Sequence, residues 1–238
     1  MSIRGGRNLY GFPIGILMLD TVFPRIPGDI GHAATFPFPV LYHKVRNASP
    51  SRVVREGDPA LLDGFIEGAR ALEANGVLAI TTGCGFLALF QRQLTEAVRV
   101  PVFTSALMLV PAVARMLGPD RAVGIMTVDS TSLGPRHLAA VGITEEIPIV
   151  IAGLEKGRAF TPVLLDNEME LDVDAARREH VEVARDLVER HPEVGAIVLE
   201  CTNMPPYAPA IRDTTGCPVF DITTLVRTVH AALVPPAY

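Results

Sequence analysis

The feature that most constrains this chain is one order of segments that occurs twice. Ile-Gly-Ile at residues 14–16 parallels Val-Gly-Ile at residues 123–125, and each tripeptide is followed by an aspartate, Asp20 or Asp129. Pro-Val-Phe then occurs late in each half, at Pro101 and again at Pro218. Several matches in the same order indicate an internal duplication, so the chain is predicted to fold as two similar units.

Short apolar runs alternate with longer segments whose apolar residues recur every three or four positions, the spacing of one helix face. Asp58 and Pro59 are a typical N-cap and first residue of a helix, and Gly76 is typical just past a helix end. This alternation predicts an α/β fold with mainly parallel sheets. We predict strands at residues 14–19, 77–80, 122–128 and 194–199, and helices at residues 59–74, 86–98 and 175–190.

Composition argues against several functional classes. The net charge of -5 disfavours a surface that coats nucleic acid, and no apolar run reaches the length that spans a bilayer. The N-terminus lacks a secretory signal pattern, and an odd number of cysteines, 3, indicates a reducing compartment. We therefore expect a cytoplasmic protein that binds a small carboxylate-bearing substrate and has no nucleic-acid or membrane partner. A homo-oligomer is compatible with the sequence.

Two cysteines stand at equivalent places in the two halves. Cys84 comes after the predicted strand 77–80, and Cys201 comes after the predicted strand 194–199. The carboxyl ends of parallel strands line the ligand crevice of open α/β sheets. Because a helix is expected directly after Cys84, the pKa of its thiol is expected to fall from about 8.5 toward neutrality.

Packing of the two halves about a pseudo-twofold axis predicts that these thiols lie on opposite sides of one substrate carbon. One thiolate then removes a proton while the other thiol delivers one, which is the geometry that stereoinversion requires. Ionisation of one thiol disfavours ionisation of its neighbour, so the pair holds opposite protonation states. No metal or cofactor is needed where N–H and hydroxyl groups stabilise the enolate-like charge.

Other uses of the cysteines and histidines are less favoured. Cys217 corresponds by position to the apolar Val100 and is predicted to be a core residue. The cysteine and histidine spacings match no zinc motif, and no glycine-rich phosphate loop is complete. His180 and His191 lie in or beside a charged helix and are expected to face solvent.

The cysteine motifs resemble those of the aspartate/glutamate racemase superfamily, which includes hydantoin racemases, arylmalonate decarboxylase and maleate isomerase. Leu-Glu-Cys-Thr-Asn-Met-Pro at residues 199–205 is similar to the second cysteine motif of that family. Residues 81–86 occupy the place of the first motif, and Asp20-Thr21 resembles its early Asp-Ser loop. The resemblance implies an amino-acid racemase type of isomerase, independent of pyridoxal phosphate, with Cys84 and Cys201 as catalytic residues.

The same resemblance implies two pseudo-symmetric three-layer α/β/α lobes with mainly parallel sheets and the active site in the cleft between them. The first lobe is expected to comprise residues 1–100 plus a C-terminal return at residues 216–238. The second lobe is expected to comprise residues 101–215.

Substrate-binding residues are expected at the strand ends and motifs that surround the two cysteines. Gly85 and Phe86 replace polar residues of glutamate racemases, and Asn203 replaces a histidine, so a bulkier or less polar substrate than glutamate is expected. Asp20 is equally explained as a strand-end cap, and Thr104 and Ser105 as caps or hydroxyl donors. The predicted substrate-binding set is Asp20, Thr21, Arg25, Thr82, Gly83, Gly85, Thr104, Ser105, Thr127, Thr202 and Asn203.

Residues 23–45 are rich in proline and glycine, which excludes a continuous helix or a central strand. Two interpretations remain: a surface loop that packs its own aromatic residues, or a lid whose Arg25 pairs with a substrate carboxylate. Two other functions also remain open. They are a cysteine-dependent isomerase or decarboxylase of the same scaffold, and a non-catalytic binding protein with duplicated lobes.

Overall fold

The two halves of the chain build two parallel sheets with the same strand order. The computed structural model describes residues 5–235, and its sheets have the orders β2-β1-β3-β4 and β6-β5-β7-β8. The strands of the first sheet are β1 (Ile14–Met18), β2 (Val40–Lys44), β3 (Ala79–Thr82) and β4 (Val102–Phe103). Those of the second are β5 (Ala122–Thr127), β6 (Ile149–Gly153), β7 (Val194–Leu199) and β8 (Val219–Phe220). The topology confirms the predicted duplication and the α/β class.

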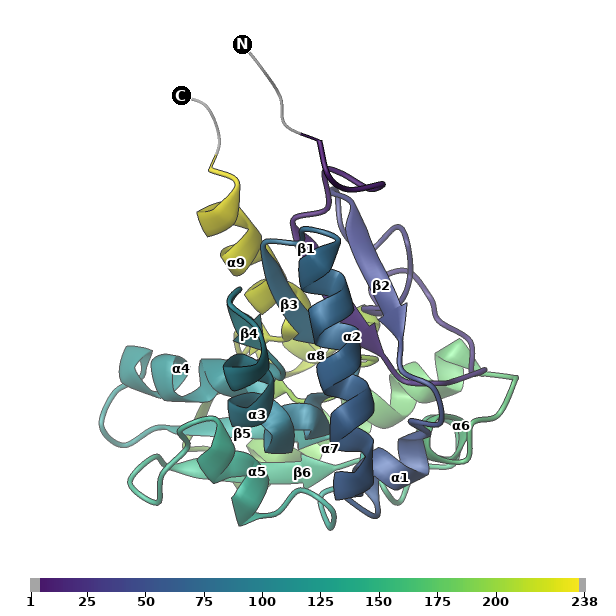
Figure 1. Ribbon diagram of the computed structural model, residues 1–238. Helices are drawn as coiled ribbons and strands as arrows, with labels where there is room; N and C mark the ends of the chain where they lie inside the picture. The colour runs from purple at the N-terminus through teal and green to yellow at the C-terminus, as the bar shows by residue number, and fades with distance from the viewer. Residues whose placement is uncertain (1–4, 236–238) are drawn as a thin grey trace.

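Helices flank both sheets, so the molecule has two α/β lobes (Figure 1). The helices of the first half are α1 (Pro50–Val54), η1 (Pro59–Leu61), α2 (Leu62–Ala74), η2 (Gly85–Phe90), α3 (Gln91–Ala97), η3 (Ala106–Leu109) and α4 (Val110–Met116), where η marks a 3-10 helix. Those of the second half are α5 (Pro135–Ala140), α6 (Thr161–Leu165), α7 (Val173–Arg190), η4 (Pro205–Tyr207), α8 (Ala208–Thr215) and α9 (Ile222–Leu233).

In the first strand of each half of the chain, a glycine lies directly against the helix that covers the strand. A Cβ on Gly15 would lie 3.0 Å from a methyl carbon of Leu72, and a Cβ on Gly124 would lie 2.9 Å from one of Leu187. Leu72 belongs to α2 and Leu187 to α7, the long helices that follow these strands. Each helix therefore packs directly on the strand backbone, and the repeat seen in the sequence reflects one packing solution used twice.

The chain crosses between the halves later than the expected lobe boundaries. β4 pairs with β3, so the first sheet extends beyond residue 100, and β8 pairs with β7, so the second extends beyond residue 215. The C-terminal return consists of α9. Arg227 of α9 donates a hydrogen bond to the carbonyl oxygen of Thr35, and His230 stacks on Phe38 with ring centroids 3.6 Å apart.

Local signals predicted the helix ends well and the helix type less well. The Asp58 side chain accepts from the N–H of Ala60, and Gly76 adopts a φ of 86° after α2, as expected. The predicted helices 59–74 and 86–98 each begin as a 3-10 helix, η1 and η2, before the α-helix starts. This matters at Cys84, because a 3-10 turn instead of an α-helix follows it.

His180 is buried, contrary to the expectation that it faces solvent. Its Nδ1 lies 2.7 Å from the carbonyl oxygen of Ala176, and its ring stacks between α7 and η4 against Tyr207 at 4.2 Å. Burial lowers the pKa of His180 to about 4, so the side chain is neutral at pH 7. Cys217 is buried, as predicted for a core residue. No helix within residues 5–235 is long and apolar enough to cross a membrane.

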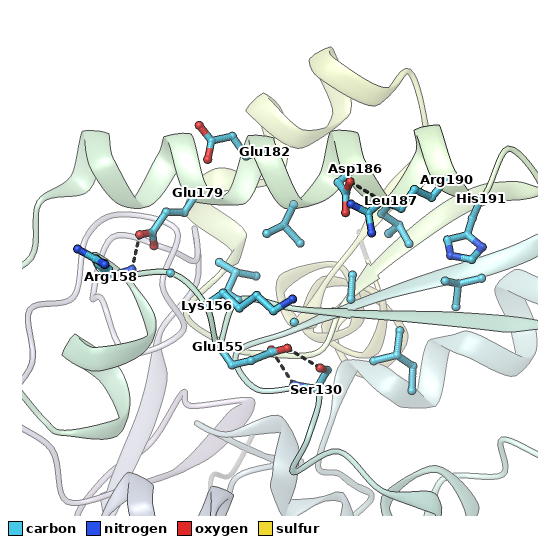
Figure 2. Close-up of a pocket in the computed structure, with 17 residues that line it drawn as sticks. Ser130, Glu155, Lys156, Arg158, Glu179, Glu182, Asp186, Leu187, Arg190 and His191 are labelled. Atoms are coloured by element: carbon cyan, nitrogen blue, oxygen red, sulfur yellow. Dashed lines mark hydrogen bonds and ion pairs between the residues drawn. The ribbon is translucent and has the colours of Figure 1, made fainter.

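A wide groove lies between the edge strand β6 and α7, away from the predicted cysteine site (Figure 2). Its volume is about 580 Å³. Several of its charged side chains are already bound within the protein: Glu155 accepts from Ser130, Glu179 from the N–H of Arg158, and Asp186 pairs with Arg190. The groove contains none of the predicted site residues.

Candidate active site

Cys84 and Cys201 line the same cavity between the two halves. Cys84 follows β3 and is the N-cap of η2, whereas Cys201 follows β7 and Glu200. The cavity measures about 20 Å³, which is room for about one water molecule. The duplicated strand ends therefore bring two thiols from different halves to one enclosed space.

Apolar side chains from both halves close this cavity. α1 contributes Pro50 and Val54, and α6 contributes Leu164 and Leu165. These two short helices contact each other, and they lie side by side in Figure 1. The remaining apolar lining residues are Leu19, Phe23, Phe86 and Val128. A substrate larger than water enters only when part of this lining moves.

Glu200 directly precedes Cys201 in the second cysteine motif, and it is fully buried. Its Oε2 accepts a hydrogen bond of 2.7 Å from the hydroxyl of Thr127, at the end of β5. Its Oε1 has no hydrogen-bond partner. The carboxyl group lies against Gly85, where a Cβ would collide with Oε1. Burial raises the pKa of Glu200 to about 8, so a large share of the group is protonated at pH 7.

The thiol pKa values are raised, which corrects the expected decrease at Cys84. Burial is the main cause, and the negative charge of Glu200 adds to it, so the pKa of Cys84 rises to about 12. The backbone N–H groups of Phe86 and Leu87 and the charge of Arg25 oppose this rise. Burial and Glu200 also raise the pKa of Cys201 well above its usual range. A 3-10 turn in an apolar site does not overcome the desolvation of a thiolate.

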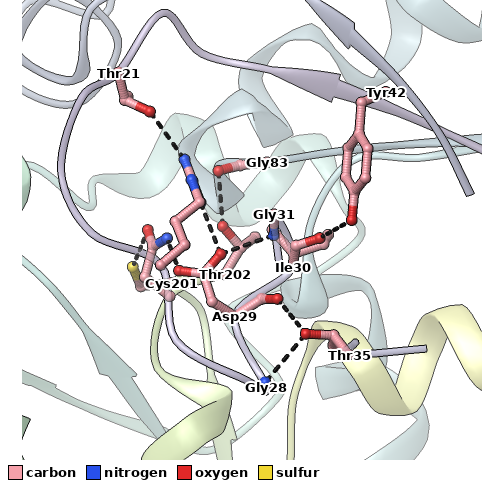
Figure 3. Close-up of polar contacts among 12 residues, drawn as sticks. Thr21, Gly28, Asp29, Ile30, Gly31, Thr35, Tyr42, Gly83, Cys201 and Thr202 are labelled. Carbon is pink, nitrogen blue, oxygen red and sulfur yellow. Dashed lines mark hydrogen bonds and ion pairs between the residues drawn. The ribbon is translucent and has the colours of Figure 1, made fainter. Parts of the chain in front are cut away.

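A polar network stands beside Cys201 and is built around the buried Asp29 (Figure 3). Asp29 Oδ2 accepts 2.6 Å from Asn203 Nδ2, and its Oδ1 accepts 2.7 Å from Arg25 and 2.7 Å from the N–H of Gly31. Asn203 Oδ1 in turn accepts from the thiol of Cys201 at 3.6 Å. Asp29 thus orients the residue that contacts the second thiol.

Arg25 is engaged by the protein itself. One guanidinium nitrogen pairs with Asp29, and the other donates 3.1 Å to the hydroxyl of Thr21. The guanidinium carbon also lies 4.6 Å from the centre of the Phe23 ring, which lines the cavity. Arg25 therefore stands one residue layer behind the cavity wall, and its expected contact with a substrate carboxylate stays a prediction.

The segment 23–45 is held in place by hydrogen bonds and ends in the edge strand β2. The hydroxyl of Tyr42 donates 3.0 Å to the carbonyl oxygen of Ile30, and the hydroxyl of Thr35 donates to that of Asp29 (Figure 3). The N–H of Ile30 donates 3.3 Å to the carbonyl oxygen of Thr202, which joins the segment to the second cysteine motif.

The predicted binding residues fall into three groups by position. Gly83, Gly85 and Asn203 line the cavity. Thr127 and Thr202 stand behind it, where Thr127 holds Glu200 and Thr202 donates 2.7 Å to the carbonyl oxygen of Gly83. Four other predicted residues do not line the cavity and interact with other parts of the protein. Asp20 pairs with Lys44, Thr82 donates to the carbonyl oxygen of Thr104, Thr104 donates to Gln91, and Ser105 caps η3.

Sequence reasoning missed Glu200, Asp29 and the apolar cover of α1 and α6. A signal for Glu200 exists, because a carboxylate directly follows the apolar run Val194–Leu199 and directly precedes a cysteine. Within residues 5–235 no group of three or more His, Cys, Asp or Glu side chains is arranged to hold a metal ion. Proton transfer among thiols and one carboxyl group is the chemistry that these residues offer.

The comparisons with known proteins agree with the motifs and the topology. The profile of the Asp/Glu/hydantoin racemase family matches residues 55–228, most of the chain. This chain belongs to that family. Its second cysteine and the residues around it lie inside the matched segment.

Several curated relatives carry the name dimethylsulfoniopropionate lyase. One from Durusdinium sp. clade D is 30% identical over 221 residues, which cover 90% of this chain and 72% of the relative. Lyase 7 of Emiliania huxleyi is 32% identical over 92% of this chain and 67% of its own length. Lyase 5 of that organism is 33% identical, and this chain spans 45% of it.

Solved structures show the same fold at lower sequence identity. A mutant of arylmalonate decarboxylase in a sulfate-associated form has a TM-score of 0.63 and 19% identity, over 94% of this chain and 95% of that one. Allantoin racemase from Klebsiella pneumoniae has a TM-score of 0.62 and 20% identity, over 92% and 88%. Glutamate racemase from Bacillus anthracis has a TM-score of 0.61 and 15% identity, over 93% and 82%.

Proposed function

We propose that this chain is a cofactor-independent lyase that acts on dimethylsulfoniopropionate or a closely related β-sulfonium carboxylate. The observation that carries the proposal is one closed, largely apolar cavity lined by Cys84 and Cys201. The lyase names of relatives that align with about nine-tenths of this chain favour elimination over racemisation. This is a proposal about the chain as given, which spans only part of those relatives.

The proposed reaction starts with removal of a proton from the carbon next to the carboxylate. We assign this step to Cys84, because two backbone N–H groups and the charge of Arg25 favour its thiolate, whereas Cys201 has one such N–H group, that of Asn203. The electron pair of the broken C–H bond forms the new C=C bond, and the C–S bond breaks. Acrylate, neutral dimethyl sulfide and one proton are the products.

Cys201 lines the same cavity from the second half of the chain. Its thiol donates toward Asn203 in the structure, and we assign it a turn toward the developing enolate, whose charge it stabilises as a hydrogen-bond donor. The apolar lining fits the two methyl groups of the sulfonium, and aromatic rings such as that of Phe86 attract a cation of this type. Neutral dimethyl sulfide needs no acid to leave.

A racemase of an amino acid or its derivative is the second candidate. One observation favours it, namely that the two cysteines come from equivalent positions of the duplicated halves, which is the arrangement that inversion of a carbon needs. Few polar side chains line the cavity, which argues for a substrate with fewer hydrogen-bonding groups than glutamate.

Incubation of the protein with dimethylsulfoniopropionate in heavy water separates the candidates. The lyase proposal predicts acrylate and dimethyl sulfide in equal amounts. Deuterium uptake at the α-carbon of amino acids or hydantoins, without acrylate, supports the racemase instead. Neither acrylate nor deuterium exchange with any of these compounds contradicts both candidates.

A further inference from the structure

The carboxyl group of Glu200 sits among the reactive groups and is not explained as a structural residue alone. It is fully buried, and only one of its two oxygens has a hydrogen-bond partner, the hydroxyl of Thr127. A buried acceptor without a partner costs free energy and persists where it has a role. Glu200 also lines the cavity that Cys84 and Cys201 line.

Gly85 shows that the first half is shaped to receive this carboxyl group. An added Cβ would collide with both Oε1 and the carbonyl oxygen of Glu200, so the residue after Cys84 must lack a side chain here. The polar group that fills this space comes from the second half of the chain, through Glu200.

The titratable and charged groups at the cavity come from three parts of the chain. Cys84 precedes η2, Cys201 follows β7, and Arg25 with Asp29 belongs to the segment 23–45. Both oxygens of Asp29 accept hydrogen bonds from Arg25, Gly31 and Asn203, so Asp29 has no free oxygen for a thiol proton. Of the carboxyl groups that act on the two thiols, Glu200 is the one with an unoccupied oxygen.

We propose that Glu200 is the internal base that takes the proton of a cavity thiol and so generates the thiolate. The S–H bond breaks, an O–H bond forms at Oε1, and the electron pair stays on sulfur. Once Glu200 is ionised, the site carries one negative charge before and after this transfer, so the transfer itself buries no further charge. The role in turnover rests on the proposed function, whereas the proton transfer itself does not.

Over one turnover of the proposed elimination, the site releases as many protons as it takes from the substrate. The thiolate takes the substrate proton and becomes a thiol again, which leaves Glu200 protonated. Glu200 then releases one proton to solvent, and this equals the one proton that elimination yields. Because the carboxylate is one cause of the raised pKa of both thiols, its protonation also makes the neighbouring thiolate less costly.

Alkylation of Cys84 by iodoacetamide, followed by peptide mass against pH, tests the proton transfer without any substrate. Glu200→Gln keeps the size of the side chain and an oxygen that accepts from Thr127, but it cannot take a proton. Wild-type alkylation is expected to rise up to about pH 8 and then to level off, because above this pH the ionised Glu200 opposes a second negative charge at the thiol. In Glu200→Gln, which lacks this charge, alkylation is expected to keep rising above pH 8 and to exceed the wild-type rate at pH 10 by at least about tenfold.

Two further variants serve as controls for this alkylation experiment. Glu193→Gln, at an exposed site that precedes β7, is expected to leave the profile unchanged, and Glu200→Asp to keep part of the levelling above pH 8. Identical profiles for wild type and Glu200→Gln would overturn the proposal, and so would a Cys84 that stays unmodified at every pH. A shifted alkylation profile without acrylate release would instead reject only the lyase function.

Discussion

The site depends on a few side chains that change the ionisation of their neighbours. Burial raises the pKa of Cys84, Cys201 and Glu200 in the same cavity, so each group favours its neutral form. Groups with raised pKa values that face one another are typical of proton-transfer sites. The absence of a side chain at Gly85 is what lets the carboxyl group stand there.

Gly85→Ala tests this arrangement at the level of one atom. The new methyl group has to displace Glu200 or the backbone next to Cys84, so we expect the free energy of unfolding to fall by about 1–3 kcal/mol. The levelling of Cys84 alkylation above pH 8 is expected to weaken as well, because the Glu200 charge moves away from the thiol. Urea unfolding and peptide mass measure the two effects.

Gly118→Ala is the matched control, because its Cβ would meet only a side-chain carbon of Arg121 at 4.0 Å. We expect it to change stability by less than about 0.5 kcal/mol. Equal stability for Gly85→Ala and Gly118→Ala would show that Glu200 does not occupy the space above Gly85.

At the level of elements, the duplicated strands and helices place both cysteines. β1 and β5 hold the same place in their sheets, next to the edge strands β2 and β6. Each is covered by a long helix, α2 or α7, that packs on a glycine of the strand. The cover of the cavity also uses both halves, since α1 and α6 meet above it. The contact between the two halves is therefore part of the cavity wall.

Gly15→Ala and Gly124→Ala test whether the two halves share one packing solution. Each added methyl group meets a leucine of the covering helix at about the same distance, 3.0 and 2.9 Å. We expect similar losses of about 1–3 kcal/mol in the free energy of unfolding for both variants. A large loss in one variant with none in the other would contradict equivalent packing.

Across the whole molecule, stability is expected to depend on pH through two buried groups with opposite effects. The pKa of His180 is lowered from 6.5 to about 4, so stability is lost as pH falls from about 6.5 toward 4. The pKa of Glu200 is raised from 4.5 to about 8, so stability is lost as pH rises from about 4.5 toward 8. The two ranges overlap between about pH 4.5 and 6.5, where the opposite slopes cancel, so the combined stability is greatest there.

Glu200→Gln isolates the alkaline side of this dependence. The glutamine stays neutral, so the stability of the variant relative to wild type is expected to rise by a few kcal/mol between pH 5 and pH 9. Thermal unfolding at several pH values measures it. A difference that does not change with pH would mean that Glu200 titrates alike in the folded and unfolded chain.

The sequence predicted the repeated architecture because strand periodicity, caps and the repeated order are local properties. Gly76 and Asp58 marked a helix end and a helix start correctly. The pKa of Cys84 was predicted in the wrong direction, since desolvation depends on α1, α6 and Glu200, which are distant in the chain. The burial of His180 on a charged helix was missed for the same reason.

The most direct test of the account is the rate of acrylate release from dimethylsulfoniopropionate by wild type, Cys84→Ser, Cys201→Ser and Cys217→Ser. Loss of an acid–base group lowers a rate by about 100-fold to 10,000-fold. The account predicts acrylate release by wild type, a loss of at least about 100-fold for Cys84→Ser and for Cys201→Ser, and near wild-type release by Cys217→Ser. Full activity of either cavity variant, or no acrylate from wild type, would contradict it.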